Sequence, residues 1–171
     1  WMWMLPDPLE NFGQSVVATT LFANNILLFL TSGYWDLTSE FKPLLHTWSL
    51  AVEEQYYLLF PLFLIGAWRW GRAKVFWLIV GLSLASLAFA EWSWRHAPVA
   101  NFFLAPTRAW ELLAGSITAF LVQRRGGQSN SLLSMAGLSA ILFAIFAFDE
   151  TTPFPSLYAL VPVCGVVLFI L

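Results

Sequence analysis

Apolar runs dominate this 171-residue chain and are separated only by short polar connections. A helix that crosses a bilayer needs about 20 mostly apolar residues, because its backbone must satisfy its own hydrogen bonds in hydrocarbon. Hydrophobic residues make up 59% of the chain and charged residues only 11%, which is more apolar surface than a soluble domain of this size could bury. The sequence therefore predicts an all-α fold, a polytopic integral membrane helix bundle.

About six apolar segments can be counted on this length rule. They run from Gln14 to Leu30, Leu45 to Trp68, Val75 to Trp92, Thr107 to Val122, Leu132 to Phe148 and Ser156 to Leu171. Five are predicted to span the membrane. The first carries several polar residues, among them Asn24 and Asn25, so it either spans or is a re-entrant element packed against protein. Because the chain begins at Trp1 without a methionine and stops inside an apolar run, we expect residues 1–171 to be the central part of one domain, truncated at both ends.

The lysines and arginines between these segments predict the orientation of the chain. Arg69, Arg72 and Lys74 lie between the second and third segments, and Arg124 and Arg125 lie between the fourth and fifth. The basic connections are predicted to be cytoplasmic. The stretch from Gly33 to Leu45, the loop from Arg95 to Pro106 and the acidic turn from Asp149 to Pro155 are then extracytoplasmic. Tryptophans at segment ends, including Trp70 and Trp77, match the aromatic belt of a membrane interface.

Polar side chains interrupt the second segment, where ionised groups are costly unless they face a polar cavity, pair with a cation or take part in chemistry. At about 100° per residue, His46, Ser49, Glu53 and Tyr57 form one stripe of the helix. Glu54 lies on a neighbouring face, so the helix is expected to be largely surrounded by protein. The stripe contains the groups needed for proton transfer to or from a hydroxyl. A hydrogen-bonded packing network is an equal alternative.

A second polar group opens the fourth segment. Arg108 and Glu111 are three residues apart and can form a local ion pair on one helix face. Alternatively, one of them reaches the region of Glu53 and Glu54, where a guanidinium would keep a buried carboxylate ionised.

Other classes of function find no support in the sequence. The net charge of -2 is scattered, whereas nucleic-acid binding needs a clustered basic surface. The sequence contains no GxSxG, no phosphate-binding glycine loop, no HExxH and no CxxC motif. We therefore expect no nucleic-acid partner and no metal.

Two long motifs resemble the acyltransferase-3 family of bacterial membrane proteins. They are Pro43-Leu-Leu-His-Thr-Trp-Ser-Leu-Ala-Val-Glu-Glu-Gln-Tyr-Tyr-Leu-Leu-Phe-Pro and Pro106-Thr-Arg-Ala-Trp-Glu-Leu-Leu-Ala-Gly. The opening Leu-Pro-Asp-Pro-Leu-Glu-Asn-Phe-Gly-Gln-Ser and the later Gly33-Tyr34-Trp35-Asp36 fit the same pattern. The resemblance extends over nearly the whole chain.

The resemblance implies a multi-pass enzyme of the bacterial inner membrane. Such an enzyme would take an acyl group, usually acetyl from acetyl-CoA or another acyl-CoA, and deliver it to a hydroxyl of a polysaccharide or glycolipid such as lipopolysaccharide. Members of the family carry a functional histidine and arginine in a first helix and an arginine-rich motif after the second. Those segments are absent here, so we expect this chain to be inactive alone. Membrane lipid is the other expected partner, and the sequence does not predict an oligomeric state.

The resemblance also suggests the site residues. We expect His46, Ser49, Glu53 and Glu54 to serve catalysis, and Trp35, Trp48, Tyr57, Arg108 and Glu111 to bind substrate. Two other classes stay open: a proton-coupled membrane transporter, in which embedded carboxylates relay protons, and a non-catalytic membrane scaffold.

Overall fold

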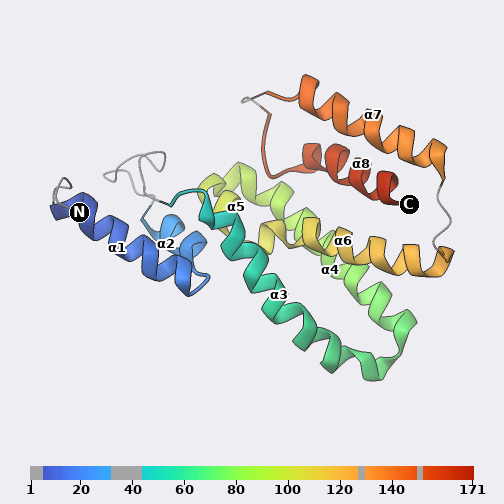
Figure 1. Cartoon of the computed structure of the whole chain (residues 1–171), viewed down its shortest axis with the longest axis horizontal. Helices are drawn as coiled ribbons and strands as arrows, with labels where there is room; N and C mark the ends of the chain where they lie inside the picture. Colours follow the sequence, from blue (N-terminus) through green and yellow to red (C-terminus); the bar gives the residue numbers. More distant parts are fainter. Residues whose placement is uncertain (1–5, 32–43, 127–129, 150–151) are drawn as a thin grey trace. The chain divides into compact units, whose positions relative to one another are not determined.

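The computed structural model describes residues 6–31, 44–126, 130–149 and 152–171. Every regular element in those ranges is a helix (Figure 1). The elements are α1 (Pro6–Thr20), α2 (Asn24–Leu30), α3 (Thr47–Ala67), η2 (Trp68–Trp70), α4 (Arg72–His96), α5 (Pro98–Phe103), α6 (Ala105–Arg125), α7 (Ser131–Ala147), η3 (Leu157–Ala159) and α8 (Leu160–Ile170). The predicted all-α class is confirmed for these residues.

Two helical stretches are long and apolar enough to cross a membrane, Thr47–Trp70 and Arg72–His96. They correspond to the second and third predicted segments. The apolar helices Ser131–Ala147 and Leu157–Ile170 are shorter. At 1.5 Å per residue, the 17 residues of α7 extend about 25 Å, less than the roughly 30 Å of a bilayer core. The described helices therefore show two membrane-length spans, and the other predicted spans are not shown.

The chain forms two compact units. Unit 1 comprises Trp1–Leu62 and Phe103–Ala105, and unit 2 comprises Phe63–Phe102 and Pro106–Leu171.

The first predicted segment is not one helix. The chain leaves α1 at Thr20 and enters α2 at Asn24, and between them Phe22 has a φ of 55°. Residues from both helices, Glu10 and Leu30 among them, line one apolar groove, so α2 turns back along α1. A single spanning helix was therefore the wrong alternative. The physical reason is that Asn24 and Asn25 are buried and bind other parts of unit 1, which a continuous helix in lipid could not offer them.

Within unit 2, α4 and α6 pack side by side in opposite directions. Just past the middle of α4, the Ser86 hydroxyl donates to the carbonyl of Pro106 at 2.6 Å and accepts from the Trp110 amide at 3.0 Å. Near its beginning, Arg72 Nη2 donates to Gln123 Oε1 at 2.7 Å. The two basic connections of the sequence therefore meet at one end of unit 2, as their common predicted side requires.

The helices α7 and α8 approach each other through two glycines. A Cβ atom built on Gly137 would overlap the backbone of Gly165 and Phe169, so only glycine fits there. Ser134 Oγ donates to the Phe169 carbonyl at 3.2 Å in the same contact. Close approach through small residues is typical of helix pairs in membranes, where backbone packing replaces the hydrophobic effect.

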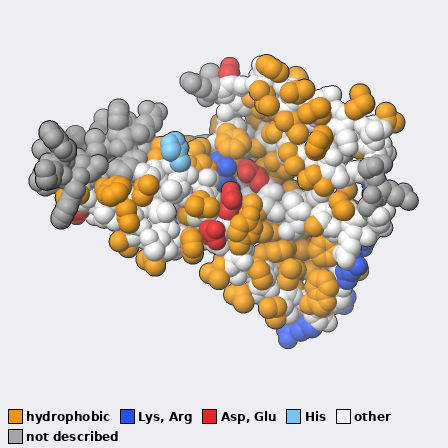
Figure 2. Space-filling view, viewed as in Figure 1, with side chains coloured by type: hydrophobic (Ala, Val, Ile, Leu, Met, Phe, Trp, Pro, Cys, Tyr) orange, Lys and Arg blue, Asp and Glu red, His pale blue; other side chains and the backbone are white. Residues whose placement is uncertain are grey.

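Hydrophobic side chains cover much of the surface of α7 (Figure 2). Leu132, Met135, Phe143, Ile145 and Phe146 are each more than half exposed. An apolar surface of this kind is typical of a membrane or protein contact.

Candidate functional site

The beginning of α3 is bound to the α1–α2 hairpin by a polar network inside unit 1. Asn24 Nδ2 donates to Thr47 Oγ1 at 2.7 Å and to the Leu44 carbonyl at 3.0 Å. The hydroxyls of Thr19 and Thr47 lie 3.0 Å apart. The protein thus supplies acceptors for the amide nitrogen of Asn24 and a partner for the hydroxyl of Thr19, two of the polar residues that made the first segment look unfit for lipid.

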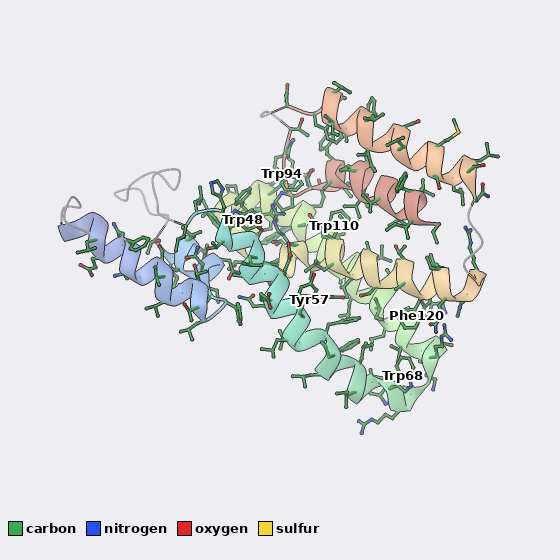
Figure 3. The ribbon with its side chains drawn as sticks, viewed as in Figure 1. Trp48, Tyr57, Trp68, Trp94, Trp110 and Phe120 are labelled. Carbon is green, nitrogen blue, oxygen red and sulfur yellow. The ribbon has the colours of Figure 1, made fainter. Side chains whose placement is uncertain are left out.

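A second part of the network lies two turns further along α3. Gln55 Nε2 donates to the Phe22 carbonyl at 2.7 Å and to Asn25 Oδ1 at 2.9 Å. Asn25 Nδ2 in turn donates to the carbonyl of Phe103 at 3.1 Å. The ring of Phe103 meets Trp48 edge to face, with centroids 5.9 Å apart. Trp48, predicted to bind substrate, therefore packs against Phe103 at the beginning of α3 (Figure 3).

Only part of the stripe predicted from His46 to Tyr57 lies on the helix. His46 is exposed and precedes α3, which begins at Thr47, so it lies in a turn and not on the helix. The Ser49 hydroxyl donates to the His46 carbonyl at 3.4 Å. Glu53 and Glu54 are half-buried on the second turn, and Tyr57 is 59% exposed. Trp35 lies outside the described residues.

The carboxylates and the packing network use different residues of α3. Glu53 and Glu54 make no hydrogen bond or ion pair within the part of the chain that the structure describes, whereas Thr47 and Gln55 hold the hairpin. The packing network in the structure is thus formed by neighbouring residues, and both alternatives for the stripe stay predictions. The expectation that α3 is largely surrounded by protein was wrong for the described chain, in which 17% of its apolar stretch is buried.

Arg108 is the centre of a separate cluster in unit 2. Its guanidinium carbon lies 4.6 Å from the ring centre of Phe154 and 5.3 Å from that of Phe102. Arg108 Nε donates to the Phe102 carbonyl at 3.1 Å, and Nη1 lies 3.6 Å from Glu111 Oε2. The predicted local ion pair of Arg108 and Glu111 is confirmed. That either residue reaches Glu53 or Glu54 stays a prediction.

Sequence reasoning did not find Asn101, which fixes one side of this cluster. Asn101 is 1% exposed, and its Nδ2 donates to the carbonyl of Pro155 at 2.8 Å. Its own carbonyl accepts from Thr107 Oγ1 at 2.7 Å. Asn101 thereby ties the start of α6 to the connection that carries Phe154. The only sequence signal was an asparagine in an apolar, aromatic stretch that was predicted to be a loop and is the short helix α5.

The two clusters offer different chemistry. Half-buried carboxylates such as Glu53 and Glu54 can accept a proton from a hydroxyl. An arginine between aromatic rings, with a carboxylate beside it, holds a fixed positive charge that can orient an anionic or polar group. The described residues contain no group of three or more His, Cys, Asp or Glu that could hold a metal.

Known proteins similar to this chain include O-acetyltransferases. An uncharacterized protein of Haemophilus influenzae is 33% identical over 164 residues, covering 87% of this chain and 66% of that protein. The peptidoglycan O-acetyltransferase OatA of Listeria monocytogenes is 29% identical over 168 residues, covering 90% of this chain and 26% of that protein. A Staphylococcus aureus protein provisionally named as an O-acetyltransferase is 33% identical over 108 residues, covering 55% of this chain and 18% of that protein.

These similarities show that the chain is related to acyltransferases that act in O-acetylation. The chain spans about two thirds of the first of these relatives and about a quarter of the second. No family model matches the chain. No solved structure matches it either.

The Arg108 cluster supports a prediction about stability. Arg108→Gln should lower the free energy of unfolding by about 1–3 kcal/mol, because Glu111 would lose its cationic partner in a largely buried place. The Arg108 side chain is 11% exposed and that of Glu111 is 24% exposed. Thermal unfolding of the purified full-length protein in detergent would measure the change.

Arg95→Gln is the matched control. Arg95 pairs with Glu91 on the same type of helix surface, but its side chain is 54% exposed. We expect this variant to stay within about 1 kcal/mol of the parent. Equal losses in both variants would show that burial of the Arg108 pair is not what stabilises unit 2.

Proposed function

We propose that this chain is the central part of a multi-pass O-acyltransferase of the acyltransferase-3 family in the bacterial inner membrane. The observation that carries this conclusion is the similarity to a peptidoglycan O-acetyltransferase over 90% of the chain. The two motifs that contain Glu53, Glu54, Arg108 and Glu111 add support. The two membrane-length helices are in keeping with a membrane location.

The reaction is transfer of an acetyl or other acyl group from acyl-CoA, supplied on the cytoplasmic side, to a hydroxyl on the outer side. Over the whole reaction the thioester C–S bond breaks, an ester C–O bond forms, and the hydroxyl proton passes to the released thiol. A base must take that proton, and a positive charge or hydrogen-bond donors must stabilise the tetrahedral intermediate.

Glu53 and Glu54 are the strongest candidates on this chain for handling the proton. They are half-buried, and other residues of α3, Thr47 and Gln55, bind the α1–α2 hairpin. We assign them, with His46 and Ser49, to the acceptor side of the active cavity. The groups proposed to position substrate there are Trp35, Trp48, Tyr57, Arg108 and Glu111.

The acceptor is proposed to be a glycan of the cell envelope. The name of the Listeria relative specifies peptidoglycan for that protein. The chemistry at this site requires only a sugar hydroxyl on a polysaccharide or glycolipid, so lipopolysaccharide and peptidoglycan are both acceptors to test.

Mass spectrometry of envelope glycans from cells with and without the intact gene tests this function. We expect loss of an ester-linked acetyl group, or a longer acyl group, in the deletion strain and its return on complementation. Unchanged glycans together with altered proton-coupled uptake would instead identify a transporter. The comparison should include purified peptidoglycan and lipopolysaccharide, because each would show the lost ester only if it is the acceptor.

A further inference from the structure

The basic residues of unit 2 gather at one end without acidic neighbours in the sequence. Five of the eight Lys and Arg residues of the chain occur in two short stretches, at 69–74 and 124–125. No Asp or Glu occurs between Glu54 and Glu91, or between Glu111 and Asp149. Figure 2 shows basic atoms where α4 begins and α6 ends, with no acidic atom among them on the visible face. This end of unit 2 is strongly electropositive.

Contacts with aromatic rings and amides hold several of these cations in place. The guanidinium of Arg72 lies 5.8 Å from the ring centre of Phe120 and donates to Gln123. That of Arg124 lies 5.1 Å from the ring centre of Phe76. These contacts restrict the two guanidinium groups, so binding an anion would cost little additional side-chain entropy. The two groups therefore form a persistent positive field at this end of the unit.

A hollow whose lining contains one cationic residue, Lys74, lies at the same end of unit 2. Trp70, Ala73, Lys74, Trp77 and Leu78 line it, and its volume is 480 Å³. Ala73, Lys74, Trp77 and Leu78 are spaced to lie on one face of α4, and Trp70 reaches the hollow from the preceding turn η2. Trp70 is 52% exposed and Trp77 is 69% exposed, so both indole rings of the lining are open at the surface. The guanidinium of Arg69 lies 5.8 Å from the ring centre of Trp70, at the rim of the hollow.

The composition of the hollow fits one kind of ligand. An ammonium group binds a phosphate as a compact point charge, and exposed tryptophans lie at the level of lipid headgroups. Basic pockets on the cytoplasmic side of membrane helices bind anionic headgroups. A small inorganic anion such as phosphate would need the cations but would gain nothing from two exposed indoles and a leucine.

We propose that the hollow formed by Trp70, Lys74 and Trp77 binds the phosphate headgroup of an anionic phospholipid. Lys74 contacts the phosphate, the two indoles lie against the glycerol and upper acyl chains, and the surrounding arginines supply the attractive field. The site lies where the charge distribution predicts the cytoplasmic surface, so it rests on the membrane location proposed above but not on the acyl-transfer activity.

Native mass spectrometry of the full-length protein in detergent tests this site. The protein would be incubated with phosphatidylglycerol or with phosphatidylcholine, which carries the same glycerol and chains but no net charge. We expect preferential retention of phosphatidylglycerol. In Lys74→Gln its retention should be about fivefold weaker, because the variant loses the attraction that one positive charge provides near an anionic surface. Arg95→Gln removes one charge from the other end of α4 and is expected to leave retention unchanged.

Each other outcome overturns the assignment. Equal retention of both lipids shows that the headgroup charge is not recognised. Equal losses in the Lys74 and Arg95 variants show a general charge effect and no site. Displacement of the lipid by free coenzyme A or inorganic phosphate at millimolar concentration shows that the hollow binds soluble anions. If the chain does not partition into membranes at all, the membrane location fails, which is distinct from failure of the lipid site.

Discussion

Replacing Glu53 or Glu54 with glutamine in the full-length protein should lower acyl transfer by about a hundredfold or more. Glutamine has nearly the same shape but cannot accept the proton of the acceptor hydroxyl, and a positioned general base contributes about 10²- to 10⁴-fold. Both side chains are half-buried near the start of α3, so the isosteric change leaves the helix and its insertion intact. Ester-linked acetyl on envelope glycan, quantified by mass spectrometry in complemented deletion strains, would measure the effect.

Glu10→Gln supplies the matched control for this experiment. Glu10 is an exposed carboxylate on α1 that accepts a hydrogen bond from Gln14 at 3.2 Å. The same chemical change at Glu10 should leave the acetyl content unchanged. Membrane fractions of all three variants should contain equal amounts of protein. Unchanged product in both Glu53→Gln and Glu54→Gln would remove the carboxylate pair from the mechanism.

Introducing a methyl group at Gly137 should destabilise the α7–α8 pair by about 3 kcal/mol. In Gly137→Ala the new Cβ would overlap the Gly165 carbonyl and the Phe169 amide, and backbone atoms cannot move aside as a flexible side chain can. Overpacking of a tight contact costs about 1–3 kcal/mol, and contact with two backbone atoms places this site at the upper end. The midpoint of thermal unfolding in detergent would report the loss.

Gly115→Ala tests whether that loss is specific to the helix contact. Gly115 also lies within a helix, but nothing is within 4 Å of a Cβ built there. Alanine is the better helix former by roughly 0.5–1 kcal/mol, so this variant should be neutral or slightly stabilised. If both glycine variants unfolded at the same temperature, close packing at Gly137 would not be what holds α7 to α8.

Helix positions followed from the sequence where apolar runs were long and uninterrupted. The stretches from Leu45 to Trp68 and from Val75 to Trp92 became α3 and α4 with bounds within a few residues. The sequence left the first segment open between a span and a re-entrant element, because the outcome depended on partners far along the chain: Asn25 binds the carbonyl of Phe103, 78 residues away. Composition showed that these asparagines needed partners, but only the fold supplied them.

In the candidate site, too, the sequence predicted some contacts and only the fold showed the others. The spacing of Arg108 and Glu111 was enough to predict their ion pair, because neighbouring positions on one helix face meet whatever surrounds them. The contact of Phe154 with Arg108, and the anchoring of that connection by Asn101, join segments about 50 residues apart. No local pattern predicts such a contact.

The sequence by itself determined the helical class, the distribution of charge between the ends of unit 2 and the motifs that relate the chain to O-acetyltransferases. These depend on hydrophobicity, net charge and residue order, which are properties of the chain before it folds. The tertiary structure decided which polar residues of α3 hold the α1–α2 hairpin, and which glycines form a helix contact. Nothing lies within 4 Å of a Cβ atom built on Gly115, whereas a Cβ atom built on Gly137 would overlap the backbone of Gly165. Such assignments depend on which surfaces meet, and that is set only when the helices pack.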